Sequence, residues 1–297
     1  MESQAYGTDP VCSFSRQLSE EQLDVIHQLL LKSPPGELYV VLEEIKDLLN
    51  GVDIPSSFLE STLKEYNLTN NVLVDVEGSK KPLLLVGSLD DDRSIYPDVS
   101  NCKCFQFDHL TNVVVQEVEY LEPDCHETMR ELKAGMIEEG NKYVNSRFCS
   151  RSGFFVGVDG DHMDVIIAGE MIKLRSYYSG RWVSRYSLDV SSDTIHMVGM
   201  VDIASHYFEN GNVRMEVHKD MNPISIAFEG NQTPSSVFNA IASFEDEVQE
   251  GLLAAFSSMK QDSLKEFRRQ LPKTHQHFTW IVNAHKMADT IKETQRQ

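Results

Sequence analysis

The sequence predicts an α+β fold with N-terminal antiparallel helices, a small β region, an antiparallel sheet covered by a long helix, and a C-terminal amphipathic arm. Three observations lead to this prediction. Apolar residues recur at helical spacing in residues 19–66 and 237–252. Residues 154–219 instead contain β-rich runs separated by turn signals. Residues 260–297 are basic, although the rest of the chain is acidic.

Length and composition set the broad class. The chain has 297 residues, 41% of them hydrophobic, which is enough to bury a sizeable core. No apolar run approaches the length of a membrane span. Residues 1–16 lack the basic and apolar segments of a secretory signal, and five scattered cysteines are typical of reduced thiols. We therefore expect a cytoplasmic protein, and the net charge of −19 argues against nucleic acid as its main partner.

Residues 1–17 are expected to form a loose N-terminal tail, and residues 18–70 a helical unit. Ser19 and Gln22 fit a capping box, in which each side chain binds a free backbone N–H at the start of a helix. Pro34, Pro35 and Gly36 end that helix. A second begins near Glu37, and a third follows Pro55. Short links between helices predict an antiparallel arrangement.

Residues 71–120 are expected to form a small β region, with short runs at 72–76, 83–86, 104–107 and 113–118. Residues 121–150 form a predicted connecting helix. Asp124 is its expected cap, and Gly135 and Gly140 weaken its helical propensity.

Residues 151–230 are expected to form the antiparallel sheet. Asp159-Gly160 and Asn210-Gly211 are strong turn signals between its strands. Residues 231–259 form the long helix that is expected to cover the apolar face of the sheet. Its apolar residues recur at spacings of four and three: Val237, Ile241, Phe244, Val248 and Leu252.

Residues 260–297 form the basic amphipathic arm. They hold eight Lys or Arg and four Asp or Glu, a net charge of +4 that leaves −23 for the rest of the chain. Leu264, Phe267 and Leu271 share one side of a helix up to Pro272. An arm of this kind predicts an acidic partner, while a solvated helix face at a chain end is the simpler alternative. Trp280 is either an interface anchor or packed on the body.

Motifs for catalysis and cofactors are absent. The sequence has neither a phosphate-binding glycine loop nor a GxSxG or HExxH motif, so we expect no enzyme and no cofactor. Cys102, Cys104 and His109 fit the spacing of a structural zinc site poorly, and reduced cysteines explain them better. An enzyme site for a small molecule within the β region remains a rival interpretation.

Five stretches resemble the F-actin capping protein alpha subunit family, in the family's order and approximate spacing from about Leu18 onward. The stretches are Ser33-Pro-Pro-Gly-Glu37, Phe105-Gln-Phe-Asp-His-Leu110, Gly180-Arg-Trp182, His206-Tyr-Phe-Glu-Asn-Gly-Asn-Val213 with His218-Lys-Asp220, and Phe267-Arg-Arg-Gln-Leu-Pro272 with Thr274 and Trp280.

The resemblance implies a non-enzymatic alpha subunit that pairs with a structurally similar beta subunit. In the family, the two subunits share one sheet under crossed long helices. The heterodimer binds actin filament barbed ends without calcium, blocks subunit addition and loss there, and so acts at the actin cytoskeleton. Phosphoinositides compete with actin for the basic arm. A rival function is therefore an arm that acts mainly as a module for binding anionic lipid.

The resemblance also implies which arm residues contact actin. Lys265 and Arg269 stand where the family's basic arm residues lie, and Lys273 is an extrapolation from them. The full set of expected charge contacts is Lys260, Lys265, Arg268, Arg269 and Lys273, and the expected apolar contacts are Leu264, Phe267, Leu271 and Trp280.

The arm also departs from the family pattern. His275 and His277 replace two basic residues, and Lys273 replaces a small apolar one. An imidazole with an ordinary pKa of about 6.5 is mostly neutral near pH 7.5. Two interpretations stay open: either these histidines tune the contact with pH, or they face solvent as bystanders.

Overall fold

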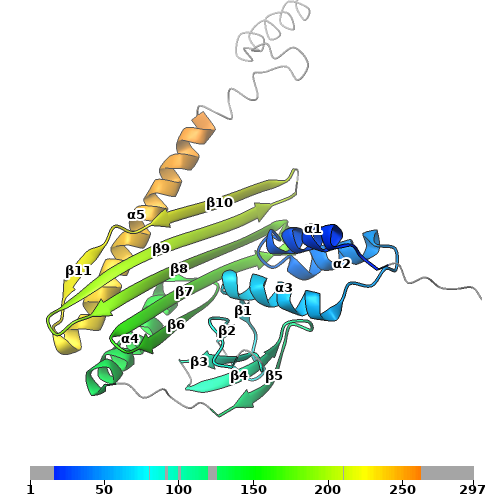
Figure 1. Ribbon diagram of the computed structural model, residues 1–297. Helices are drawn as coiled ribbons and strands as arrows, with labels where there is room; N and C mark the ends of the chain where they lie inside the picture. The colour runs from blue at the N-terminus through cyan, green and yellow to red at the C-terminus, as the bar shows by residue number, and fades with distance from the viewer. Residues whose placement is uncertain are drawn as a thin grey trace, which may run out of the picture. The chain divides into compact units, whose positions relative to one another are not determined.

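The computed structural model describes residues 17–79, 81–90, 93–99, 102–119, 126–209 and 211–261. The chain divides into two compact units, residues 1–238 and residues 239–297. The first contains the helical unit, the small β region, the connecting helix and the sheet (Figure 1).

The N-terminal helices are α1 (Glu20–Leu31), α2 (Leu38–Leu48) and α3 (Ser56–Thr69), as the apolar periodicity predicts. The capping box is confirmed: Gln22 N donates to Ser19 Oγ at 3.3 Å, and Ser19 N donates to Gln22 Oε1 at 3.0 Å. One apolar core joins the three helices, because none can bury its apolar stripe alone. Its buried members are Ile26, Leu30, Leu38, Leu42, Ile45, Ile54, Leu59, Leu63 and Tyr66.

The small β region contains two sheets. Strand β1 (Leu73–Val74) pairs with β2 (Leu83–Leu84), and β4 (Lys103–Asp108) lies between β3 (Ile95–Asp98) and β5 (Val113–Val118). Strand β3 was not predicted from sequence. It contains Pro97, a residue that lowers strand propensity because it lacks an N–H, and it lies beside a turn-rich stretch.

The connecting helix α4 (Glu127–Arg147) begins later than the predicted start of 121, with His126 at its N-cap position. The predicted cap, Asp124, lies outside the described residues. Gly140 has a packing role, because a Cβ there would lie 2.6 Å from Cε2 of Phe154 on β6. The helix therefore approaches the sheet closely at this glycine.

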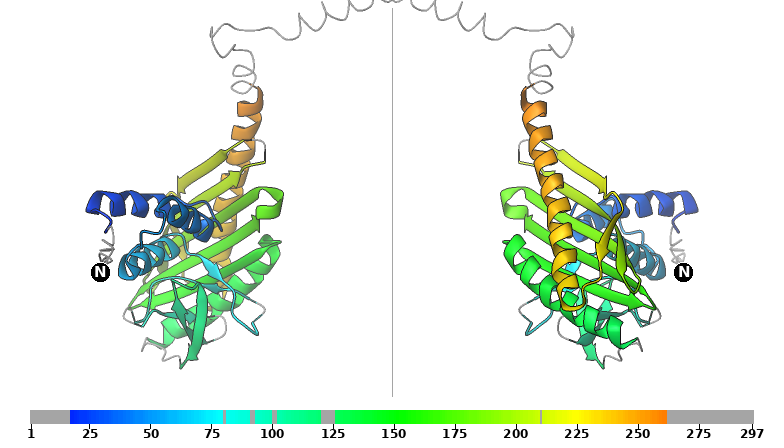
Figure 2. Two further views of the ribbon diagram at one scale, coloured as in Figure 1. Left: turned by 90° about the vertical axis from the view of Figure 1, so that its right-hand side faces the viewer. Right: turned by 90° about the vertical axis from the view of Figure 1, so that its left-hand side faces the viewer.

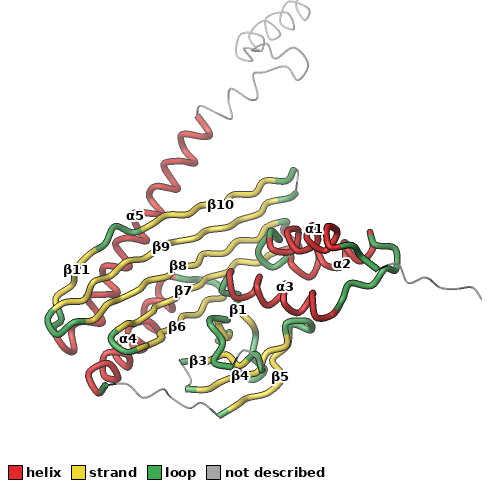
Figure 3. The backbone as a smooth tube through the Cα atoms, viewed as in Figure 1, coloured by secondary structure: helices red, strands yellow, loops and turns green. Residues whose placement is uncertain are grey.

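The main sheet is an antiparallel meander. Its strands are β6 (Arg151–Asp159), β7 (His162–Lys173), β8 (Tyr178–Val190), β9 (Thr194–Tyr207), β10 (Val213–Asp220) and β11 (Ile224–Ala227). Their spatial order is β10-β9-β8-β7-β6, and β11 pairs with the first part of β9 on the same side as β10 (Figure 3). Gly160 lies in the predicted turn between β6 and β7 with a φ of 59°. Gly211 lies between β9 and β10, while its neighbour Asn210 is outside the described residues.

The two faces of this sheet meet different elements (Figure 2). One, here called the helical-unit face, carries Ala168 and Val183, which pack with Leu73 and Leu84 of the small β region. The other, the α4 face, carries Phe154 beneath α4. Parts of the first unit therefore pack on both faces of the sheet.

The last described helix is α5 (Thr233–Gln261), which follows the short η2 (Gly230–Gln232) and matches the predicted long helix. Its first turn belongs to the first unit, where the rings of Phe238 and Tyr143 have centroids 5.5 Å apart. The rest belongs to the second unit. The prediction that this helix covers the sheet therefore stays a prediction.

Candidate assembly interface

Strand β10 forms an open edge of the main sheet. It pairs with β9 along its whole length, and no other described strand pairs with its outer side. Every second residue of such a strand directs its N–H and C=O outward. The eight residues are exposed or half-exposed, with Val213 at 61%. The edge can therefore accept another strand.

Four charged or ionisable side chains alternate along β10 on the helical-unit face. Their places follow from the register with β9: Arg214 lies opposite His206, Glu216 opposite Ala204, and His218 opposite Asp202. Asp220 completes the alternation. The strand therefore presents the sequence of basic, acidic, basic, acidic beside its open edge.

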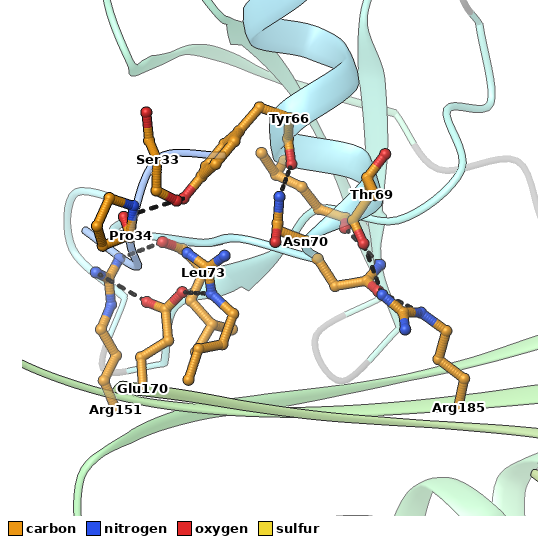
Figure 4. Close-up of polar contacts among 12 residues, drawn as sticks. Ser33, Pro34, Tyr66, Thr69, Asn70, Leu73, Arg151, Glu170 and Arg185 are labelled. Carbon is orange, nitrogen blue, oxygen red and sulfur yellow. Dashed lines mark hydrogen bonds and ion pairs between the residues drawn. The ribbon is translucent and has the colours of Figure 1, made fainter. Parts of the chain in front are cut away.

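A row of charges that is buried at Glu170 and Arg181 crosses the same face at the level of Glu216. The register places Arg151, Glu170, Arg181 and Ala204 side by side on successive strands, ending at Glu216. Arg181 Nε donates to Glu170 Oε1 at 2.8 Å, and both side chains are at most 5% exposed. Arg151 Nη1 lies 3.8 Å from Glu170 Oε2 (Figure 4). Opposite charges alternate along this row, as a buried carboxylate requires.

The helical unit is anchored to this row through Tyr66. The Arg181 guanidinium lies over the Tyr66 ring, 5.8 Å from its centroid. The hydroxyl donates towards the backbone oxygens of Ser33 and Pro34, each 3.2 Å away (Figure 4). Burial raises the pKa of Tyr66, so the phenol stays a donor. The tyrosine therefore ties α3, the link after α1 and the sheet together.

A second anchor joins two of the stretches that carry the family resemblance. Glu37 Oε1 lies 2.7 Å from His206 Nδ1 and accepts a 2.9 Å hydrogen bond from Ser179 Oγ. His206 Nε2 lies 3.0 Å from Asn212 Oδ1. Glu37 is 169 residues from His206 along the chain, so only the folded structure brings them together. This contact fixes the start of α2 beside the β9–β10 connection.

A third anchor lies nearer the middle of the sheet. Arg185 donates from Nε to Asn71 Oδ1 at 2.8 Å and from Nη2 to Thr69 O at 2.6 Å (Figure 4). Its Nη1 lies 2.5 Å from Asp202 Oδ2, and the other oxygen of that carboxylate lies 2.6 Å from His218 Nδ1. The hydrogen bond with Asp202 raises the pKa of His218 and so favours its cationic form.

A groove of about 390 Å³ runs beside this anchor to the edge strand, lined by α3 and strands β8 to β10. Glu216 lies in it and has no polar partner in the described part of the chain. The three anchors hold the helical unit on the sheet but leave β10 open. The arrangement thus leaves a charged strand edge open among the described residues.

Most of the predicted actin contacts lie beyond the described residues. Lys260 is in the last turn of α5, and its side chain is not described. The predicted contacts that lie outside the described residues are Leu264, Lys265, Phe267, Arg268, Arg269, Leu271, Lys273 and Trp280. The anchoring residues Glu37, Tyr66, Glu170 and Arg185 were not predicted from sequence. Of these four residues, only Glu37 was marked by a sequence signal, because it ends a stretch that carries the family resemblance.

Metal and membrane features are limited in the described ranges. Those ranges contain no group of three or more His, Cys, Asp or Glu placed to hold a metal ion. None of their helices has the length and apolarity to cross a bilayer. Trp182 is half-buried, and its Nε1 has no hydrogen-bond partner among the described residues.

Comparisons with known proteins show to which family the chain belongs. A sequence model of the F-actin capping protein alpha subunit matches residues 26–290. The chain belongs to this family. The F-actin-capping protein subunit alpha of Gibberella zeae is 29% identical over 264 residues, which cover 87% of this chain and 92% of that protein. The subunit of Dictyostelium discoideum is 26% identical over 267 residues, covering 88% and 94%.

A solved structure of a family member has the same fold. It is the homodimeric actin capping protein alpha subunit from Plasmodium berghei, with a TM-score of 0.69 and 19% identity. The match covers 85% of this chain and 97% of that one. The α+β architecture is therefore confirmed. The names of the relatives support a role in actin capping for this family.

Proposed function

We propose that this chain is the alpha subunit of a heterodimer that binds the barbed ends of actin filaments and blocks subunit addition and loss there. The observation that carries the proposal is the extent of the family match, residues 26–290. It includes both the open edge strand β10 and most of the basic arm. We place the complex at the cytoplasmic actin cytoskeleton.

The open edge supports the choice of a subunit with its own sheet as partner. A beta subunit whose sheet ends in a similar edge can continue the β-ladder through the outward N–H and C=O groups of β10. The three anchors support this role, because they fix the sheet before the partner arrives. A preorganised edge loses little conformational freedom on binding.

The charge distribution supports the arm as the filament contact. Actin is acidic, the arm carries +4, and the remainder of the chain carries −23. Contact through the remainder would bring like charges together, whereas contact through the arm brings opposite charges together. The basic residues in this role are Lys260, Lys265, Arg268, Arg269 and Lys273, with apolar contacts from Leu264, Phe267, Leu271 and Trp280.

The test is co-expression with a capping protein beta subunit, followed by filament elongation from barbed-end seeds. The intact heterodimer is expected to stop elongation. A heterodimer truncated after Met259 is expected to stay assembled but to cap at least tenfold more weakly, because it lacks the arm. Elongation that continues at saturating intact heterodimer would refute the proposed function. Equal capping after truncation would refute the role of the arm.

Two further parts of the proposal have separate readouts. Capping is expected to be unchanged when EGTA removes calcium. Vesicles that contain phosphoinositides are expected to relieve capping by competing for the arm. If the intact complex floats with such vesicles but does not sediment with filaments, the arm is instead a lipid-binding module.

A further inference from the structure

A cavity of about 590 Å³ lies within the first unit, where the helical unit, the small β region and the main sheet meet. One part of its wall is tightly packed, because a Cβ on Gly36 would lie 2.7 Å from Cδ1 of Ile172 on β7. Cavities that bind small molecules have volumes of about 300–1,000 Å³ and combine apolar walls with a few polar groups. This cavity therefore has the size of a ligand site.

Two buried polar atoms in the cavity wall have no hydrogen-bond partner among the described residues. They are Nε of Arg151 on β6 and Oε2 of Glu170 on β7. The Glu170 side chain is 1% exposed, and its other oxygen accepts a hydrogen bond from Arg181 Nε at 2.8 Å. Both side chains point away from the sheet, on the side of the helical unit (Figure 4). Buried polar atoms nearly always have partners, so this pair points to a bound group that donates to Glu170 and accepts from Arg151.

The two atoms lie close enough for one small molecule to reach both. The register places Arg151 directly opposite Glu170 on the neighbouring strand. Nη1 of the Arg151 guanidinium lies 3.8 Å from Glu170 Oε2, which is too long for a hydrogen bond. Nε is bonded to the same guanidinium carbon as Nη1. The wall therefore presents a carboxylate oxygen and a guanidinium N–H as neighbours.

The charges around the cavity disfavour a simple ion. Three cations and two carboxylates line it: Arg151, Lys173, Arg181, Asp75 and Glu170. A simple cation at Glu170 Oε2 would meet three positive charges, and a simple anion at Arg151 Nε would meet the Glu170 carboxylate. Like charges at short range repel each other. A ligand that carries both charges, the positive one at Glu170 and the negative one towards Arg151 and Lys173, avoids both conflicts.

Apolar side chains from α2, β1 and β7 also line the cavity. They are Leu38, Leu73, Val74 and Ile172. An apolar group of the ligand that moves from water onto these side chains gains free energy. The free α-amino acid is the class of molecule that joins an ammonium and a carboxylate through one carbon and adds a side chain at that carbon.

We propose that this cavity binds a free α-amino acid with an apolar side chain. The ammonium donates to Glu170 Oε2, the carboxylate accepts from Arg151 Nε and lies towards Lys173, and the side chain packs on the apolar wall. Hydrogen bonds between charged groups are roughly twice as strong as neutral ones. The site uses neither the basic arm nor the open edge of β10, so it does not depend on the proposed function.

The test is isothermal titration calorimetry of the full-length chain with L-leucine, L-methionine and L-phenylalanine. At least one of them is expected to bind saturably, with one molecule per chain. The N-acetyl form of the tightest binder lacks the ammonium, and its amide form lacks the carboxylate. Each form is expected to bind about tenfold more weakly or worse, because a buried charge of the protein then stays unpaired.

Two variants address the carboxylate contact. Lys173→Met removes an exposed cation from the wall, and it is expected to fold normally and to weaken binding about threefold. Arg151→Lys keeps the charge but removes Nε, and a loss of about tenfold is expected. Arg175→Met is the matched control, because this exposed cation does not line the cavity. It is expected to bind as the wild type does. Thermal melting checks that each variant is folded.

Failure of all three amino acids to bind would overturn the inference and would mean that water alone fills the cavity. Binding of the N-acetyl or the amide form as tightly as the free amino acid would also overturn it. The same holds for unchanged affinity in Lys173→Met, which decides alone if Arg151→Lys does not fold. Filament capping by a heterodimer is a separate readout, so failure of either proposal leaves the other intact.

Discussion

At the scale of single residues, the structure depends on charges that are buried only because they are paired. Glu170 is 2% exposed, and its two oxygens face the guanidiniums of Arg181 and Arg151. Removal of one partner from a buried pair leaves an uncompensated charge, whereas removal of both leaves a packing change. This distinction can be measured.

We expect Arg181→Met to lower the free energy of unfolding by ~3–5 kcal/mol, because Glu170 would keep only the more distant Arg151. The double variant Glu170→Met, Arg181→Met is expected to lose less than this single variant. Urea unfolding of the full chain measures both. Arg175→Met, at an exposed position, is the matched control, and its expected change is below about 0.5 kcal/mol. A double variant no more stable than Arg181→Met would contradict the account.

A second residue-scale prediction concerns His109, which is buried between Asn67 and Tyr96. Burial, with a smaller contribution from Lys64, lowers its pKa from 6.5 to about 4. The unfolded chain therefore binds a proton first as the pH falls. We expect about 3 kcal/mol of stability to be lost between pH 6.5 and pH 4, with none lost from this group above pH 6.5.

Urea unfolding across this pH range tests the sign of the change in stability with pH. His109→Gln is expected to flatten the slope, since glutamine has no titrating ring. His162→Gln is the control with the opposite sign, because a hydrogen bond with Asp189 raises the pKa of His162. That histidine stabilises the fold at low pH and stops doing so as the pH rises through its folded pKa. Parallel slopes for wild type and His109→Gln would show that His109 does not titrate as expected.

These residue-scale contacts could not be predicted from sequence, because their partners lie far apart along the chain. Glu37 and His206 are 169 positions apart, and Arg185 and Asn71 are 114 apart. A capping box such as Ser19 and Gln22 was predictable because both partners lie within one turn. These contacts depend on how the helical unit docks on the sheet, which neither apolar periodicity nor composition determines.

At the scale of elements, local pattern predicted more. The three N-terminal helices, the β meander and the long helix α5 all follow from apolar spacing. Strand β3 did not, because Pro97 interrupts its strand pattern. The glycines of α4 show a further limit, since helical propensity alone treats Gly140 as a weakness. The structure shows that a larger residue there would meet Phe154.

We therefore expect Gly140→Ala to destabilise the chain by ~1–3 kcal/mol in urea unfolding, despite the better helical propensity of alanine. Its Cβ would lie 2.6 Å from Phe154 Cε2, so the ring or the helix must move. Phe154→Leu added to this variant is expected to recover part of the loss. Gly251→Ala in α5 is the control, because no described atom lies within 4 Å of its added Cβ. It is expected to be neutral or stabilising, and a stabilised Gly140→Ala would disprove the close packing.

At the scale of the whole molecule, charge is divided between two parts. The chain carries −19, made of −23 before residue 260 and +4 from residue 260 onward. If the arm meets the acidic filament, the two parts act in opposite directions during association. In that case we expect the arm to attract the filament and the remainder of the chain to repel it. Family and fold could be predicted from sequence, and the arm's contacts with actin stay predictions.

The final prediction follows from this division. Added salt shortens the Debye length from about 10 Å at 0.1 M to about 3 Å at 1 M and weakens both forces. If the arm contacts the filament through its charges, the capping rate of the intact heterodimer is expected to fall with salt, because the positive arm would lie nearer to the filament than the negative remainder. After truncation at Met259 only repulsion remains, so the residual rate is expected to stay level or rise. Seeded elongation at several salt concentrations measures both rates. The variant Lys265→Gln, Arg269→Gln keeps the arm's length but lowers its charge, and its salt dependence should lie between the other two. The same salt dependence for the intact and truncated proteins would mean that the arm does not contact actin through its charges.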